Sequence, residues 1–210
     1  MQAPKVGRPK SKQKREAILN AAQVLFLANG VKQTSMEEVA KHSGVSKQTV
    51  YSHYRSKDAL FSAVIKFKCE EYLITNEGLA ESETSLEKAL TQIGTKFLGL
   101  FHDEAVVSVY STMIAEARNA PHMAELFYET GPLASIKALA EVLHELSDIK
   151  ISKANAHALA IDFYGFIKGE FHTQSLMNMD FRLKESEREA YVAKVVEKTL
   201  CLLNNYYSQD

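Results

Sequence analysis

The sequence predicts an all-α protein whose N-terminal part is a helix-turn-helix unit. Apolar residues recur at helical spacing through most of the 210 residues, and no segment shows the apolar–polar alternation of a strand. Capping residues and glycines divide the periodic segments from one another. With 46% hydrophobic residues, a chain of this length can bury a full core in one large or two small units.

The first predicted helix covers residues 12–29 and supports the two helices that follow. Its apolar residues share one face, at relative positions i, i+3, i+4, i+7 and i+8: Ile18, Ala21, Ala22, Leu25 and Phe26. Asn29 and Gly30 predict its end, because both tolerate the left-handed conformation of a helix C-terminus.

A second, short helix is predicted up to Gly44. Two overlapping capping boxes could begin it, Thr34 with Glu37 or Ser35 with Glu38, and the sequence leaves both open. Gly44 can form the tight turn of a helix-turn-helix because it adopts a positive φ without steric cost.

The third helix follows Ser46, a good N-cap, and carries the candidate DNA-binding residues. They are rich in hydrogen-bond donors and free of negative charge, as a recognition helix in a major groove requires: Lys47, Gln48, Thr49, Tyr51 and His53. Ser56 then begins a fourth helix, and Lys57 lies in its first turn. A cation is unfavourable there unless an anion such as a phosphate lies nearby, so Lys57 joins the candidates.

Charge is distributed unevenly along the chain. Residues 1–57 contain eleven Lys or Arg and three acids, a net charge of +8, whereas the remainder contains fourteen basic and twenty-three acidic residues. This asymmetry predicts phosphate binding by the N-terminal part. Residues 1–12 are expected to form a flexible basic arm, in which Arg8 and Lys10 could reach a minor groove. The alternative is an N-terminus that only aids solubility.

Taken together, residues 14–60 resemble the DNA-binding domain of the TetR family of bacterial transcriptional repressors. Matching positions include Arg15, Ala22, Phe26, Gly30, Thr34, Ala40, Gly44, Val45, Ser46, Thr49, Tyr51, Tyr54, Ser56, Lys57 and Leu60. The chain departs from the family at Gln48, where a small residue or proline is frequent. An amide there could bind an adenine edge and give the protein its own operator preference. The helix-turn-helix domain is therefore expected over 13–58.

Beyond this domain, residues 59–210 are predicted to form a helical effector-binding and dimerisation domain. Helices are expected at 59–74, 85–101, 104–118, from Pro121 through Phe127, and, after a break at Gly131–Pro132, up to about Ser147. Two long helices, 152–176 and 184–207, complete it. Residues 114–132 resemble the AefR-like C-terminal branch of the same family.

The last two helices are apolar around more of their circumference than one core-facing stripe requires. Self-association is the simplest way to bury a second face, and it predicts a homodimer with four candidate interface residues: Tyr164, Ile167, Val196 and Leu203. The alternative is that the fold itself encloses both helices. A dimer would present paired recognition helices to a palindromic double-stranded DNA operator.

An effector pocket is predicted among the aromatic and soft residues of the middle helices. The candidates are Phe67, Phe97, Phe101, Tyr110, Met113, Phe127 and His172, although each residue alone fits a core position better. A mostly apolar pocket suits a small hydrophobic molecule. The resemblance to the TetR family implies that such a pocket exists.

Other functional classes find little support in the sequence. It has no metal cluster, nucleophile–base set or glycine-rich phosphate loop, so neither catalysis nor a cofactor is predicted. No apolar run is long enough to cross a membrane, and a cytoplasmic protein with reduced Cys69 and Cys201 is expected. A redox role for Cys69 stays open. We expect a repressor released by a hydrophobic effector; the alternatives are an activator or a DNA-bound regulator controlled by a protein partner.

Overall fold

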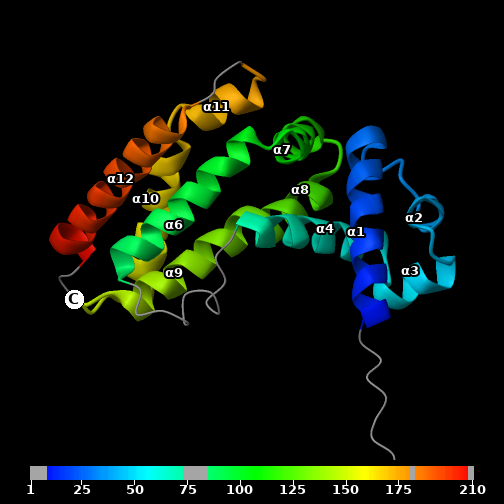
Figure 1. Cartoon of the computed structure of the whole chain (residues 1–210), viewed down its shortest axis with the longest axis horizontal. Coiled ribbons are helices and arrows are strands. Elements are labelled where there is room, and N and C mark those ends of the chain that lie inside the picture. The colour runs from blue at the N-terminus through cyan, green and yellow to red at the C-terminus, as the bar shows by residue number, and fades with distance from the viewer. Residues whose placement is uncertain (1–8, 73–84, 180–182, 208–210) are drawn as a thin grey trace, which may run out of the picture. The chain divides into compact units, whose positions relative to one another are not determined.

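The computed structural model describes residues 9–72, 85–179 and 183–207, and every regular element in these ranges is a helix (Figure 1). This confirms the all-α prediction. The chain divides into two compact units, Met1–Phe67 and Lys68–Asp210. The boundary falls within one helix, α4 (Lys57–Tyr72), and the functional division after residue 58 stays a prediction. In the described ranges, no helix combines the length and apolarity needed to span a bilayer.

The first unit contains α1 (Pro9–Asn29), α2 (Met36–Ser43), α3 (Lys47–His53) and the start of α4. Its core takes the predicted face of α1 and inward residues of the other helices: Ile18, Leu19, Ala22, Phe26, Val39, Val50, Leu60 and Phe61. The rings of Phe26 and Phe61 meet edge to face, with centroids 5.9 Å apart. This ring contact packs α4 against α1.

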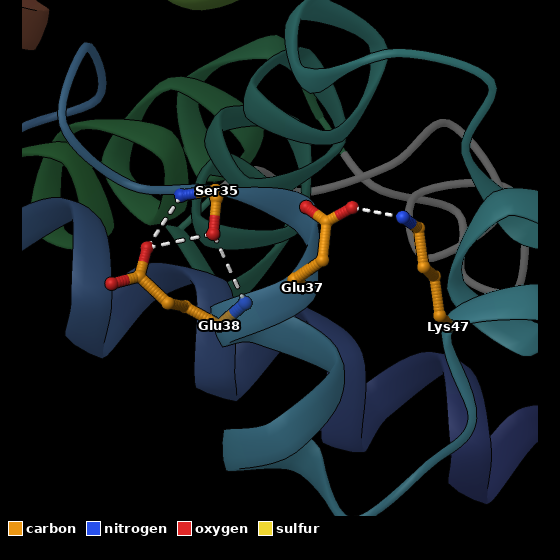
Figure 2. Close-up of polar contacts among 4 residues, drawn as sticks. All are labelled: Ser35, Glu37, Glu38 and Lys47. Carbon is orange, nitrogen blue, oxygen red and sulfur yellow. Dashed lines mark hydrogen bonds and ion pairs between the residues drawn. The ribbon is translucent and has the colours of Figure 1, made fainter.

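Caps fix the lengths of the short helices. Of the two possible capping boxes, the structure contains Ser35 with Glu38 (Figure 2). Thr34 instead is buried, and its hydroxyl donates to the Gly30 carbonyl over 2.9 Å. Gly44 adopts a φ of 68°, as the predicted turn requires. The Ser46 hydroxyl accepts from the Thr49 amide and begins α3.

Helix α1 already begins at Pro9, within the range predicted for the flexible arm. Proline suits the first position of a helix, where its fixed φ is favourable and its missing N–H costs nothing. Lys10 therefore belongs to α1 and not to an extended arm. Arg8 lies outside the described residues.

The second unit contains the remaining helices. These are α6 (Leu86–Gly99), η1 (Leu100–His102), α7 (Glu104–Glu116), α8 (Pro121–Tyr128), η2 (Glu129–Leu133), α9 (Ala134–Leu146), α10 (Lys153–Lys168), α11 (Phe171–Leu176), α12 (Glu185–Leu202) and η3 (Leu203–Tyr207). Helices α6, α9 and α12 pack around α10 (Figure 1). Its inward residues, among them Leu159, Phe163 and Ile167, are fully buried in the core of this unit.

Two predicted boundaries differ in the structure. The expected break at Gly131–Pro132 is the π-helical turn η2, which joins α8 to α9. The predicted helix 152–176 is interrupted at Gly169, whose φ is 41°. A Cβ at this position would clash with the Tyr191 hydroxyl, so only glycine fits. Tyr191 donates from that hydroxyl to the Phe166 carbonyl over 2.6 Å and thereby satisfies the end of α10.

Candidate functional site

The predicted recognition helix α3 turns one face inward and one outward. Val50 is fully buried and anchors the helix to the first unit. The predicted DNA contacts Lys47, Gln48 and Tyr51 are exposed to solvent. This face offers an ammonium, an amide and a phenol in a donor-rich row, which is the chemistry needed to read base edges and phosphates.

The two other candidates on α3 are less available. Thr49 is half-buried, and its hydroxyl lies 2.8 Å from that of the cap Ser46. His53 is half-buried at the end of the helix, with its ring 6.2 Å from that of Tyr54. Thr49 thus contacts the N-cap of α3, and His53 contacts the residue that follows the helix.

Lys47 forms an ion pair with Glu37, which lies in the first turn of α2 (Figure 2). The ammonium also lies over the Tyr51 ring, 5.7 Å from its centroid. The hydrogen bond from Lys47 holds the pKa of the Glu37 carboxyl below its usual range, and Glu37 in turn raises the pKa of Lys47. Both groups therefore stay charged at neutral pH.

Glu37 was not predicted as a functional residue, because in the sequence it is one half of a possible capping box. Its contact depends on the turn at Gly44, which brings the start of α2 beside the start of α3. Only this geometry could identify it, since ten residues separate Glu37 from Lys47 in the sequence.

Lys57 makes a contact different from the predicted phosphate. Its ammonium donates to the carbonyls of Lys32, over 2.9 Å, and of Thr34, over 3.2 Å. These carbonyls lie in the turn between α1 and α2. The positive charge at the start of α4 is therefore stabilised within the protein.

Five of the seven predicted effector residues form a continuous chain of ring contacts in the second unit. The centroid distances are 5.7 Å for Phe97–Phe101, 5.3 Å for Phe101–His172, 5.1 Å for His172–Tyr110 and 5.0 Å for Tyr110–Phe127. Of the remaining two, Met113 is buried in this unit, whereas Phe67 belongs to the first. We call the five residues the aromatic cluster.

Polar groups around the aromatic cluster are few. Burial, followed by the charge of Lys168, lowers the pKa of His172, which favours the neutral imidazole. Burial raises the pKa of the Tyr110 phenol. Ser175 donates to the Phe101 carbonyl over 2.9 Å and ties α11 to η1. The site is therefore mostly apolar, with the His172 imidazole, the Tyr110 phenol and the neighbouring Lys168 ammonium as polar groups.

The cysteines differ in accessibility. Burial raises the pKa of the Cys69 thiol to about 11, while Cys201 is exposed. A thiol with so high a pKa is a poor nucleophile at neutral pH, which argues against a redox role for Cys69.

The four predicted interface residues lie in the core of their own unit. Tyr164 and Ile167 on α10 and Val196 and Leu203 towards the C-terminus are at most 3% exposed. They are covered by helices of the same chain, so they cannot contribute area to a dimer interface. The fold of one chain thus encloses these four side chains, although it does not enclose all of α10.

Other residues of α10 and α12 remain on the surface. Ile161 is 48% exposed, which is high for a large aliphatic side chain. A groove of about 250 Å³ lies nearby on these helices, lined by Gly165, Phe166, Gly169, Tyr191, Lys194, Val195 and Lys198. The Lys198 ammonium lies 5.6 Å from the centroid of the Phe166 ring. This outward face is available for contact with another molecule.

Two family models match the chain. Residues 18–64 match the model of bacterial regulatory proteins of the tetR family, and residues 88–203 match the AefR-like transcriptional repressor C-terminal domain. The two matches coincide with the helix-turn-helix and with most of the second unit.

Individual proteins agree with these models. The HTH-type transcriptional regulator AcrR of Shigella flexneri is 25% identical over 206 residues, 89% of each chain. The HTH-type transcriptional repressor BepR of Brucella suis is 38% identical over 63 residues, which cover 29% of this chain and 30% of that protein.

Solved structures share the fold. The flavonoid-responsive regulator FrrA superimposes with a TM-score of 0.63 at 29% identity, covering 90% of this chain and 96% of its own. A TetR transcriptional regulator from Agrobacterium tumefaciens has a TM-score of 0.68 at 19% identity, covering 90% and 93%.

Proposed function

Since the chain belongs to the TetR family of DNA-binding transcriptional regulators, which are not enzymes, we propose that it represses transcription from a palindromic operator and is released by a small hydrophobic effector. The observation that carries the proposal is the outward face of α3. Lys47, Gln48 and Tyr51 are exposed together on it, in a unit with a large excess of positive charge. Such a face suits a major groove.

The proposed active form is a homodimer. A palindromic operator requires two recognition helices, about 34 Å apart on one side of the duplex. The outward face of α10 and α12, with Ile161 and the groove beside Lys194, is the surface we propose for this contact. It replaces the four buried residues named from the sequence.

The proposed effector site is the aromatic cluster. Edge-to-face rings such as Tyr110 and Phe127 attract one another through their quadrupoles, and an aromatic ligand could make the same contacts. The neutral His172 imidazole and the Tyr110 hydroxyl would supply hydrogen bonds. The similarity to FrrA, described as flavonoid-responsive, supports a planar aromatic effector of this kind.

Helix α4 is the proposed link between the effector site and the DNA-binding unit. At its start, Lys57 binds carbonyls of the first unit. Near its end, Lys68 forms an ion pair with Asp103 over 2.9 Å, and Asp103 also caps α7. An effector that moves α7 would thereby shift α4. Release requires the effector to bind the DNA-incompetent arrangement more tightly, and a coupling of about 1–3 kcal/mol changes affinity about 5- to 150-fold.

Operator affinity with and without effectors tests this proposal. The operator is first selected from random duplexes, and binding is then measured in the presence of flavonoids and other uncharged aromatic compounds, with sugars as controls. At least one aromatic compound should both raise the melting temperature and weaken operator binding. Compounds that raise the melting temperature but leave operator affinity unchanged would favour a constitutive regulator or one controlled by a protein partner.

Repression itself needs a separate readout. A reporter gene behind the selected operator should be silenced by the protein and relieved by the same compound. Increased transcription in the presence of the protein would identify an activator instead.

A further inference from the structure

The ion pair between Glu37 and Lys47 places a carboxylate beside the recognition helix. Glu37 is 52% exposed and Lys47 is 60% exposed, so both side chains can meet a DNA surface. Figure 2 shows the two side chains pointing toward each other across the turn between α2 and α3. A phosphate that approaches Lys47 must therefore compete with an acid already bound to it.

The capping box of α2 does not involve the Glu37 side chain. The N-terminus of α2 is satisfied by Ser35 and Glu38: the Ser35 amide donates to the Glu38 carboxylate over 2.7 Å, and the Glu38 amide donates to the Ser35 hydroxyl over 3.2 Å. Glu37 points away from this box, toward α3 (Figure 2). Glu37 lies in the first turn of α2, where the helix dipole attracts a negative charge. This attraction does not require a contact between Glu37 and Lys47.

We propose that Glu37 is a specificity-determining residue, which positions Lys47 for the operator and suppresses binding to other DNA; this inference rests on the proposed function. Non-specific binding is almost wholly electrostatic, so a carboxylate beside a phosphate-seeking lysine removes one effective charge from it. In the operator complex, the base contacts of α3 add to the binding. In that complex, Glu37 and the Tyr51 ring restrict the Lys47 side chain to one direction. This restriction reduces the conformational entropy that Lys47 loses when it binds the operator.

The test compares Glu37→Gln with the unmodified protein on two duplexes. One is the operator selected by the unmodified protein, and the other is a mixed-sequence duplex of equal length without that operator. For the mixed-sequence duplex we expect a rise in affinity of about tenfold per subunit at 0.1 M salt, and a plot of log affinity against log salt that is steeper by about 0.9 per subunit. Operator affinity should rise less. The ratio of operator affinity to mixed-sequence affinity should therefore fall by at least about threefold, a change that the release of one counterion per subunit can produce.

Two further variants separate the effect of the Glu37–Lys47 pair from the effect of the protein's net charge. Glu141→Gln removes one exposed carboxylate from α9 in the other unit and should change both affinities less than twofold, a change expected of a remote, screened charge. In a Lys47→Gln background, Glu37→Gln should change the salt dependence much less, because no lysine is freed to neutralise a phosphate. The melting temperature of Glu37→Gln should fall only slightly, because an exposed charge at a helix N-terminus contributes about 0.3–1 kcal/mol.

The outcomes are distinct. If the unmodified protein selects no DNA sequence, the proposed function fails. If it selects an operator, but Glu37→Gln leaves the salt dependence and the affinity ratio as Glu141→Gln does, this inference is overturned. An equal effect of Glu37→Gln with and without Lys47 would also overturn it.

Discussion

The ammonium of Lys57 donates a hydrogen bond to the main-chain carbonyl of Thr34, with an Nζ–O distance of 3.2 Å. A second bond to the Lys32 carbonyl connects the start of α4 to the same turn. The hydroxyl of Thr34 is itself bound to the end of α1. These contacts connect the end of α1, the turn before α2 and the start of α4.

Lys57→Met should therefore lower stability more than a surface lysine would. It removes two hydrogen bonds while keeping the apolar stem, so we expect a loss of about 1 kcal/mol in the free energy of unfolding, measured in urea. Lys41→Met, on the exposed side of α2, is the matched control and should change it by less than about 0.5 kcal/mol. If Lys57 also binds a phosphate, as the sequence predicts, the same substitution should make the salt dependence of DNA binding shallower. Unchanged stability would contradict the role of its two hydrogen bonds.

The dimer proposal makes opposite predictions for two isoleucines of one helix. Ile161→Glu adds a charge to the exposed face of α10 and should give a folded monomer in sedimentation experiments. Ile167→Glu would place a charge in the core and should unfold the protein, because an unpaired buried charge costs several kcal/mol. A folded dimer of the Ile161 variant would exclude this face as the interface.

Histidine protonation should make the second unit sensitive to acid. Burial lowers the pKa of His172 below its ordinary value of 6.5, so below that pH the unfolded chain binds a proton more readily than the folded one. Stability is thus fully present above pH 6.5 and falls as the pH drops towards the lowered pKa. His172→Phe should reduce the loss of stability between pH 7.5 and 5.5 (about one unit on either side of the ordinary value). Parallel stability curves for the two proteins would contradict this.

The thiols should react at very different rates. With a pKa of about 11, roughly one Cys69 side chain in a thousand is a thiolate at pH 8. A disulfide reagent should therefore modify Cys201 rapidly and Cys69 slowly, and Cys201→Ser should remove the fast phase. A fast phase that persists in this variant would show that Cys69 is accessible and reactive.

Much of the fold follows from local sequence. The short helices α2 and α3 follow their N-caps Ser35 and Ser46 and are joined by the turn at Gly44. These are short-range interactions that periodicity and capping rules describe. The break at Gly169 could not be predicted in this way. It depends on Tyr191, which reaches the end of α10 from a helix more than twenty residues later.

The sites were predictable to different degrees. The outward residues of α3 follow from its helical period, because Val50 must face the core. The pairing of Glu37 with Lys47 and the internal partners of Lys57 depend on how the turns fold. The burial of Tyr164 and Val196 depends on how many helices surround α10 and α12, which periodicity in one segment does not show.

The central claim, that α3 reads a palindromic operator, is tested most directly by selecting binding sites from random duplexes with the unmodified protein and Gln48→Ala in parallel. The unmodified protein should enrich two inverted half-sites whose centres lie about 34 Å apart along the duplex. Gln48→Ala should lose preference at one position of each half-site, equivalent to about 1–3 kcal/mol, and retain the others. Enrichment of no common sequence, or of the same sequence with equal stringency by both proteins, would contradict the account.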